Sequence, residues 1–446
     1  MLDLLSSGLI SLGLPMMGVE PQSLETFTLL ASGAGWTLPA PPDSEIATTI
    51  DRYLQQLEAQ GQLSGEQGIW LQSGVQTLAD RAGTTPRSAA SITKIATSLA
   101  ALKTWKSDRQ FETAIDARGT VENGVVQGDL VVTGGSDPLF VSKEAIVVGN
   151  ALESMGIRRV TGDLIVEGSF AMNFESDPQI AGQLLKEAID SSLWSPQTQA
   201  EYEELPPKTP KPRITIEGTV KPKKAADDRR GLFRQTPATV PLLRHQSLPL
   251  ARLLKEMNVH SNNDMAQMLA DALGGAAVVA GTAARAAAVP PEEIQLINGS
   301  GLGQENRISP RAACAMFVAI QRHLLPLGLN IGDVFPVMGR DIGTLEDRQM
   351  PQASAVKTGT LWNVSALVGV LPTRDRGLVW FAIVNGGGDY VENFRASQDT
   401  LLQTLQQQWG GKPHLWPPLA TTPTSTFETD LYRLGAVHRN QILWGG

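Results

Sequence analysis

Residues 88–102 read "SAASITKIATSLAAL", a small and apolar run interrupted by one lysine, Lys94, three residues after Ser91. The run has the pattern of a helix, and residues three apart on a helix lie on the same face and can touch. Lys94 is therefore either a solvated helix residue or a base held against the Ser91 hydroxyl. A Ser-x-x-Lys motif arises about once by chance in a chain of this length, so the choice depends on the rest of the sequence.

A second Ser-x-x-Lys pair, Ser354 and Lys357, lies in a segment with the pattern of a β-strand. Residues three apart on a strand point to opposite faces, so only Ser91 and Lys94 are placed to act together. A serine hydroxyl needs a neighbouring base to become a strong nucleophile. Lysine serves as that base when burial or a second cation lowers its pKa towards neutrality. The hypothesis therefore predicts a second cation in the same site.

Lys357 is the predicted second cation, because it opens a Lys-Thr-Gly motif at the start of an expected strand. Glycine at Gly359 lets a ligand approach the backbone closely, and Thr360 follows it in the same strand. Thr358 supplies a hydroxyl for a substrate carboxylate. Taken alone, this motif would be explained as an ordinary edge strand.

A third polar motif, Ser261-Asn262-Asn263, lies between two predicted helices, where a loop presents side chains to a cleft. Serine and asparagine also favour the N-cap of a helix, so this motif alone has a good structural explanation. The argument for a site comes from the order of all three motifs: Ser-x-x-Lys, then Ser-x-Asn, then Lys-Thr-Gly.

In this order the motifs resemble the signature of penicillin-binding proteins and serine β-lactamases. The surrounding sequences narrow the resemblance to the D-alanyl-D-alanine carboxypeptidases of penicillin-binding protein 4 type, peptidase family S13. Those sequences are "RSAASITKIATSLAAL", "LPLARLLKEMNVHSNNDMAQML", "NGSGLGQENRISP", "GTLEDR" and "VKTGTL". The middle motif differs from the frequent Ser-Asp-Asn pattern at Asn262, but its two outer residues are kept.

The resemblance implies an α/β (α+β) fold of the penicillin-binding-protein and serine β-lactamase type, with an antiparallel sheet flanked by helices and β-rich inserted domains. Near the C-terminus, "SAVKTGTLW", "SALVGVLPT" and "GLVWFAIVNG" predict three successive strands. In the insertion, "GDLVV" from Gly128 and "GDLIV" from Gly162 each predict a turn leading into a strand. The expected division is an N-terminal arm or atypical export segment at 1–40, a DD-peptidase domain at 41–110 and 248–415, an inserted region with a Pro/Lys-rich loop at 111–247, and a C-terminal tail at 416–446.

The resemblance also implies a mechanism. Ser91 would attack the carbonyl between the last two D-alanines of a peptidoglycan stem peptide, and Lys94 would accept its proton. Ser261, with Lys357, would pass the proton to the departing amine. The backbone N–H groups of Ser91 and Thr360 would hold the oxyanion.

Substrate binding is expected from four residues: Asn263, Thr358, Gly359 and Thr360. Asn263 would hold the amide of the acyl side chain, and Thr358 would take the terminal carboxylate. A D-Ala–diaminopimelate cross-link is a second expected substrate, and β-lactams are expected to acylate Ser91. The alternatives are a serine β-lactamase and a non-catalytic peptidoglycan-binding module of the envelope. The glycine-rich stretch 298–310 is interpreted as a structural turn close to the site.

Charge and residue counts exclude several other functions. The net charge is −8 and the pI about 5.3, which offers no basic field to nucleic acid. The five histidines show no paired-ligand spacing, and Cys314 is the single cysteine. We therefore expect no metal site, no cofactor and no intrachain disulfide.

The N-terminal segment does not match a standard export signal. Its first 19 residues are apolar with one charge, Asp3, and the first Lys or Arg is Arg52, whereas a secretory signal begins with a positive region. Its Gly and Pro residues also make it a poor membrane helix. We expect an atypical export segment, a peripheral membrane contact or a packed arm. The substrate implied by the resemblance lies outside the cytoplasm, so the expected location is the periplasm or cell envelope.

Overall fold

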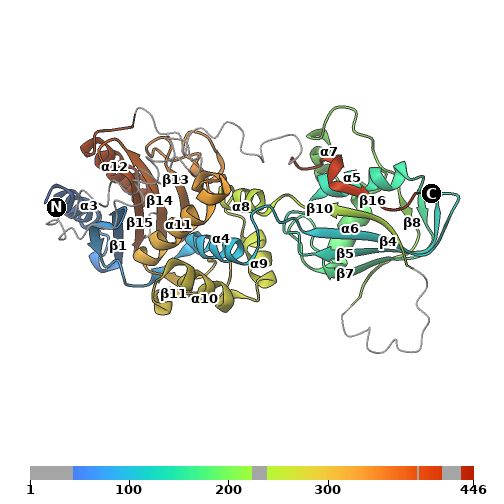
Figure 1. Ribbon diagram of the computed structural model, residues 1–446, viewed down its shortest axis with the longest axis horizontal. Helices are drawn as coiled ribbons and strands as arrows, with labels where there is room; N and C mark the ends of the chain where they lie inside the picture. The colour runs from blue at the N-terminus through green and yellow to red at the C-terminus, as the bar shows by residue number, and fades with distance from the viewer. Residues whose placement is uncertain (1–43, 224–238, 389–390, 414–432, 446) are drawn as a thin grey trace, which may run out of the picture.

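The protein forms two lobes, each built around its own sheet (Figure 1). The chain enters the second lobe after α4 (Thr93–Thr104) and returns to the first between β10 (Thr239–Gln246) and α8 (Leu250–Val259). The structure is a computed structural model that describes residues 44–223, 239–388, 391–413 and 433–445.

A five-stranded antiparallel sheet forms the centre of the first lobe, which confirms the expected sheet type. The three C-terminal segments predicted as strands are β13, β14 and β15, and β13 lies at one edge of the sheet. The first residues of this edge are covered, because Ala355 forms a bridge with Val337 and the Val356 N–H donates to the Pro336 carbonyl at 2.9 Å. An edge strand can pair with another segment or a ligand along the rest of its length, from Lys357 onward. In spatial order the strands are β13 (Ala355–Leu361), β14 (Val364–Thr373), β15 (Gly377–Gly386), β1 (Gln67–Ser73) and β2 (Gln76–Arg81).

The two faces of this sheet pack on two separate cores, because successive side chains of a strand point to opposite sides. On β14, Ala366, Val368 and Val370 belong to one core. Leu367 and Leu371 belong to the other. All residues of β14 are buried, which explains why its sequence is a continuous apolar run rather than an alternating one.

Helices cover both faces of the sheet (Figure 1). The helix predicted around Ser91 is confirmed as α4, in which all residues from Thr93 to Leu102 are buried. A helix buried all round lies at the centre of its domain, so the first turn of α4 is held on every side. One face is covered by α3 (Ser44–Ala59) and α12 (Val391–Gln408), and the other by α4, α8, α9 (Asn263–Ala272), α10 (Ala276–Ala287) and α11 (Pro310–Leu324).

A small three-stranded sheet fixes the chain just before α4. It consists of β3 (Arg87–Ser88), β12 (Arg307–Ile308) and β11 (Ile294–Gln295). The Ala89 N–H continues this pairing by donating to the Asn306 carbonyl at 2.8 Å. The start of α4 is thereby tied to the glycine-rich stretch at 298–310.

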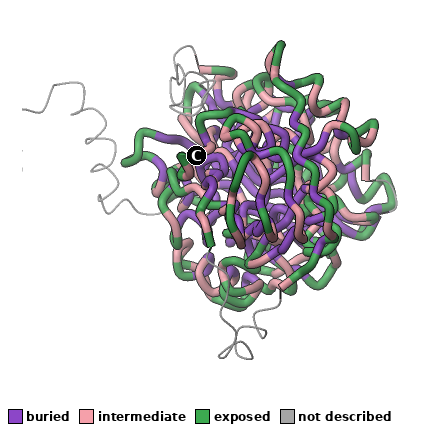
Figure 2. The backbone as a smooth tube through the Cα atoms, turned by 90° about the vertical axis from the view of Figure 1, so that its right-hand side faces the viewer, coloured by how far each residue is buried: buried purple, intermediate pink, exposed green. Residues whose placement is uncertain are grey.

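The second lobe has a sheet with both antiparallel and parallel pairs, with helices packed beside it (Figure 1). Figure 2 looks onto this lobe and shows buried residues inside it with exposed residues around the periphery. The sequence predicted strands here but not the helices α5 (Ser142–Ser154), α6 (Pro178–Ala188) and α7 (Pro196–Glu203). The strands are β4 (Glu112–Glu122), β5 (Val125–Gly135), β6 (Arg159–Val160), β7 (Leu164–Ser169), β8 (Thr215–Ile216), β9 (Val220–Pro222), β10 and β16 (Asn440–Ile442).

The two predicted Gly-Asp-Leu turns lead into β5 and β7, and these strands lie side by side in parallel. Leu130 is opposite Leu164 in this pairing. The Asp163 N–H donates to the Asp129 carboxylate at 2.8 Å, so the two turns stack directly on each other. The faint sequence similarity between the two stretches therefore corresponds to two equivalent layers of one sheet.

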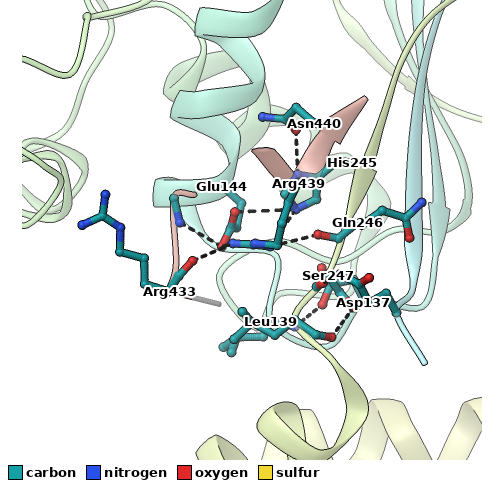
Figure 3. Close-up of polar contacts among 12 residues, drawn as sticks. Asp137, Leu139, Glu144, His245, Gln246, Ser247, Arg433, Arg439 and Asn440 are labelled. Atoms are coloured by element: carbon teal, nitrogen blue, oxygen red, sulfur yellow. Dashed lines mark hydrogen bonds and ion pairs between the residues drawn. The ribbon is translucent and has the colours of Figure 1, made fainter. Parts of the chain in front are cut away.

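The C-terminal segment 433–445, predicted only as part of a tail, belongs to the second lobe. Its strand β16 pairs with β10, and the neighbouring Arg439 is buried. The Arg439 guanidinium donates to the Glu144 carboxylate at 2.5 Å and to the Gln246 carbonyl at 2.9 Å (Figure 3). Both charged side chains are at most 2% exposed. This pair fastens the end of the chain to helix α5.

Within the described residues, no single helix has the length and apolarity that crossing a bilayer requires. The bent pair α9 and α10, at 84° to each other, meets those criteria only when both helices are counted together.

The Arg439–Glu144 pair predicts a large loss of stability on substitution. Arg439→Ala removes the guanidinium from the buried Glu144 carboxylate, which keeps only the Gly435 N–H at 3.1 Å and the His245 ring at 3.6 Å, and we expect this to lower the free energy of unfolding by about 3–5 kcal/mol. Arg159→Ala is the matched control, since Arg159 pairs with Glu217 in the same lobe with both side chains about half exposed, and we expect it to lower that free energy by less than about 1 kcal/mol. Urea unfolding followed by tryptophan fluorescence measures both. Equal losses for the two variants would contradict the assigned role of Arg439.

Candidate active site

Ser91 lies in a 3₁₀ turn, Ala90–Ile92, that leads directly into α4. The Lys94 Nζ group donates to the Ser91 Oγ atom at 3.1 Å, so the contact expected from helical spacing is present. Ala90, just before the serine, has a left-handed φ of 47°. Such a conformation is unfavourable for alanine and is retained only where the surroundings impose it.

Lys94 is completely buried, yet its hydrogen-bond partners are all neutral. Besides Ser91, its Nζ group donates to the Asn263 Oδ1 atom at 2.7 Å and to the Ser300 carbonyl at 2.8 Å. These acceptors satisfy the three N–H groups of an ammonium ion. Burial nevertheless lowers the pKa of Lys94 to about 7, and the charge of Asp264 offsets only part of that effect. The solvated-lysine explanation is therefore wrong for this residue.

Lys357 is the second cation that the sequence predicted, and it is also completely buried. Its Nζ group donates to the Ser261 Oγ atom at 3.0 Å and to the Thr358 carbonyl at 2.8 Å. Burial lowers the pKa of Lys357 well below its usual value, and the positive charge of Lys94 lowers it further. Both lysines thus share one electrostatic environment.

In the Ser261-Asn262-Asn263 motif, the middle residue caps a helix and the two outer residues belong to the site. Asn262 is the N-cap of α9, and its side chain accepts from the Met265 N–H at 2.9 Å. Ser261 and Asn263 instead meet Lys357 and Lys94. The N-cap explanation is therefore correct for the middle residue of the motif and incomplete for the outer two.

Gly359 brings the edge strand β13 against the serine. A Cβ atom at this position would lie 3.0 Å from the Ser91 nitrogen, the Ile92 nitrogen and the Ala89 oxygen. That distance is tighter than ordinary van der Waals contact, so glycine allows the close approach. The backbone of β13 and the amide of Ser91 consequently border the same space.

Gly301 likewise allows a close backbone contact, here with the residue that precedes Ser91. Its φ is +87°, and a Cβ atom there would lie 1.8 Å from the Ala90 oxygen. The neighbouring Ser300 carbonyl can therefore reach Lys94. The interpretation of 298–310 as a turn close to the site is confirmed, and the turn additionally supplies an acceptor to the lysine.

A pocket of about 310 Å³ opens in front of these groups. The pocket is lined by Ser91, Ser261, Thr358 and Thr360, which the sequence predicted for the site, and by further residues that it did not predict. The stretch "GTLEDR" at 343–348 contributes to the family resemblance but contains no catalytic motif, and Arg395 lies in a helix without a motif. The unassigned lining residues are Gly343, Thr344, Glu346, Asp347, Arg348 and Arg395.

Metal ligation finds no support in the part of the chain that the structure describes. No group of three or more His, Cys, Asp or Glu side chains there is placed to hold a metal ion.

The central antiparallel sheet, its flanking helices and the three converging motifs are the features of the penicillin-binding-protein fold. Comparisons with known proteins agree with this assignment. A family model described as "D-Ala-D-Ala carboxypeptidase 3 (S13) family" matches residues 46–188 and 214–408, about three quarters of the chain. The chain belongs to this family.

Two solved structures show the same fold. Penicillin G-acylated Bd3459, a predatory endopeptidase from Bdellovibrio bacteriovorus in complex with an immunity protein, is 21% identical with a TM-score of 0.65, over 79% of this chain and 96% of that one. Penicillin binding protein 4 (dacB) from Haemophilus influenzae, complexed with a β-lactam, is 20% identical with a TM-score of 0.59, over 79% and 99%.

Curated relatives match over shorter segments. Carboxypeptidase DacB from Mycolicibacterium smegmatis is 29% identical over 158 residues, 31% of this chain and 34% of that protein. D-alanyl-D-alanine carboxypeptidase DacB from Haemophilus influenzae is 33% identical over 94 residues, 21% of this chain and 20% of that protein. The chain spans about a third or less of the length of these two relatives.

The packing at Gly301 predicts opposite effects for two glycine substitutions. Gly301→Ala places a methyl group against the Ala90 oxygen at a positive φ, so we expect it to destabilise the protein by at least about 1–3 kcal/mol. Gly281→Ala, in the middle of α10, meets only the Arg285 side chain at 3.4 Å and should stabilise it by up to about 1 kcal/mol. Thermal unfolding of both variants checks this. A neutral Gly301→Ala would show that the turn does not press on Ala90.

Proposed function

We propose that this protein is a serine DD-peptidase that hydrolyses the D-Ala-D-Ala bond of peptidoglycan stem peptides through an acyl-enzyme on Ser91. The observation that carries the proposal is the contact of 3.1 Å between the Ser91 hydroxyl and the buried Lys94 amine. Family membership supports the same reaction class.

Lys94 acts as the general base in this mechanism. A base must lose its own proton before it can accept one, and a group with a pKa near the working pH does this most effectively. Because burial lowers the pKa of Lys94 to about 7, a substantial fraction of the molecules carries a neutral amine near neutral pH. The Ser91 hydroxyl then transfers its proton to Lys94 as it attacks the scissile carbonyl.

The negative charge that develops on the carbonyl oxygen needs donors on the open side of Ser91. The backbone N–H groups of Ser91 and Thr360 are proposed for this role, because the missing side chain of Gly359 lets β13 approach the serine. Each such donor is typically worth roughly 3–4 kcal/mol in the transition state. The Ser261 hydroxyl, held by Lys357 at 3.0 Å, then gives its proton to the departing amine and receives in return the proton that Lys94 took from Ser91. Lys94 is neutral again, and it accepts a proton from the water that hydrolyses the ester and returns this proton to the Ser91 oxygen.

Asn263 and Thr358 are proposed to bind the two ends of the substrate. The Oδ1 atom of Asn263 accepts from Lys94, so its Nδ2 group is the one presented to the amide of the acyl side chain. Thr358, which lines the pocket, would donate to the terminal carboxylate. Cleavage of D-Ala–diaminopimelate cross-links by the same groups is part of the proposal, supported by the endopeptidase name of one structural relative.

β-Lactams are proposed as covalent inhibitors, since the relative of the same fold is acylated by penicillin G. We further propose that the protein works in the periplasm or cell envelope, where such a substrate lies. A peripheral membrane contact would come from the N-terminus, and residues 1–43 are outside the described residues.

Labelling with a fluorescent penicillin tests the nucleophile. We expect one equivalent of label on the wild-type chain and none on Ser91→Ala, because the acyl-enzyme ester needs the Ser91 oxygen. Ser354→Ala is the matched control, since it removes the serine of the other Ser-x-x-Lys pair and should label like wild type. Label on Ser91→Ala at the wild-type level would refute the assignment.

The same assay separates the alternatives. Covalent labelling with release of D-alanine from a pentapeptide supports the peptidase, and rapid loss of the label supports a β-lactamase. An absence of labelling supports a binding module that does not turn peptidoglycan over.

The lowered pKa of Lys94 predicts how acylation depends on pH. Below pH 7 the amine is protonated and cannot accept the serine proton, so the rate constant for penicillin acylation should rise about tenfold per pH unit and level off above pH 7. Stopped-flow labelling from pH 5 to 9 measures this, with thermal stability at each pH as the control. A flat profile across pH 7, or a midpoint near the usual lysine value, would contradict Lys94 as the base.

A further inference from the structure

Arg395 is a pocket residue to which the mechanism above gives no role. It reaches the site from α12, and its Nη2 group donates to the Thr360 Oγ1 atom at 2.9 Å. The other arginine that lines the pocket, Arg348, is held by the Asp399 carboxylate at 2.6 Å with only 4% of its side chain exposed. The Arg395 side chain is 31% exposed and borders the space in front of Ser91.

We propose that Arg395 binds the free carboxylate of the departing amino acid and makes the enzyme selective for peptides that end in one. The inference rests on the proposed function, because it names the group that recognises the leaving side of the same substrate.

The position of Arg395 follows from the direction of β13. With the scissile carbonyl at the N–H groups of Ser91 and Thr360, the leaving residue extends by one Cα–Cα step, about 3.8 Å. Its carboxylate therefore comes next to the hydroxyls of Thr358 and Thr360, which share one face of the strand because they are two residues apart. The Arg395 guanidinium lies within hydrogen-bond distance of the second of these hydroxyls.

The hydrogen bond to Thr360 also orients that hydroxyl for an anion. The Oγ1 atom accepts from Arg395, so the O–H group is left to donate. A carboxylate between the two residues can accept from the hydroxyl and from the guanidinium, and charge-assisted bonds of this kind are the strong ones. Thr360 and Arg395 thus form a donor pair that is arranged before the substrate arrives.

The carboxylates that line the pocket oppose the binding of an anionic substrate. Glu346 and Asp347 also line the pocket, and both are exposed carboxylates that repel an entering anion. The Arg395 guanidinium, which lines the same pocket, offsets them, whereas Arg348 is already paired with Asp399. The existing partner of Arg395, Glu392 at 2.8 Å, is 76% exposed, and such a surface pair is weak enough to leave the guanidinium available.

A competing explanation is that Arg395 only supports Thr360 and so holds β13 in place. The two explanations differ in their effect on a substrate that lacks the carboxylate. A support for the strand matters equally for every substrate, whereas a carboxylate-binding group matters only when the carboxylate is present.

The experiment compares two peptides with the full-length protein: an N-acylated L-Lys-D-Ala-D-Ala with a free carboxylate, and the same peptide as a C-terminal amide. For Arg395→Gln we expect kcat/KM on the free acid to fall at least about 30-fold, and the preference for acid over amide to fall towards 1. Arg395→Lys keeps the charge but not the two-pronged geometry, so it should retain an intermediate preference.

The matched control is Arg374→Gln. Arg374 also pairs with a neighbouring carboxylate on the surface of the first lobe, at 2.9 Å from Asp375, and it does not line the pocket, so its variant should keep the wild-type preference. Thermal unfolding establishes that each variant is folded.

Two results would overturn the role of Arg395 while leaving the proposed function in place. In the first, Arg395→Gln loses activity equally on the acid and the amide, which identifies a support for the strand. In the second, it keeps the full wild-type preference. A wild-type chain that cleaves neither peptide and takes up no penicillin would instead overturn the proposed function, and the inference with it.

Discussion

Two completely buried lysines that donate to neutral acceptors dominate the energetics of the site. Lys94 donates to a hydroxyl, an amide oxygen and a carbonyl, and Lys357 to a hydroxyl and a carbonyl. Neutral acceptors orient an ammonium group but do not cancel its desolvation, so the pKa falls and the amine loses its proton readily. A carboxylate in direct contact would have stabilised the fold more and kept Lys94 protonated. The arrangement therefore favours basicity over stability.

Holding two such groups together requires an unusual backbone around them. Ala90 and Ser261 have left-handed φ values of 47° and 52°, Gly301 is pressed against the Ala90 oxygen, and Gly359 against the Ser91 nitrogen. The left-handed φ values are unfavourable for alanine and serine and persist only when their surroundings are rigid, and the two glycines allow the close backbone contacts that no side chain would permit. Here the rigid surroundings are the buried helix α4 on one side and the central sheet on the other.

The sequence predicted the parts of the site that depend on local spacing. Ser91 and Lys94 meet because they are three residues apart on a helix, and β13 to β15 follow from short apolar runs separated by turns. The Ser300 carbonyl could not be predicted, because a backbone acceptor has no sequence signature.

Arg395 was missed for a different reason. It reaches Thr360 from 35 residues away through the packing of α12 on the sheet, a contact that local periodicity does not encode. The same holds for the C-terminal strand β16. It has only three residues, and its partner strand β10 lies almost 200 residues earlier in the chain.

The second lobe is inserted between two elements of the site without separating them. The segment by which the chain leaves the first lobe is hydrogen-bonded to the segment by which it returns. The Phe111 N–H donates to the Ser247 hydroxyl, and the Ser247 N–H donates to the Phe111 carbonyl, both at 2.8 Å. When the two ends of an insertion are close together, the host structure closes around them with little strain. Helix α8 can then pack on α4, where the Asn258 side chain donates to the Ser98 hydroxyl at 3.1 Å. Because α8 leads directly to Ser261, the hydrogen-bonded pair of segments at Phe111 and Ser247 places the second motif beside the first despite the long intervening chain.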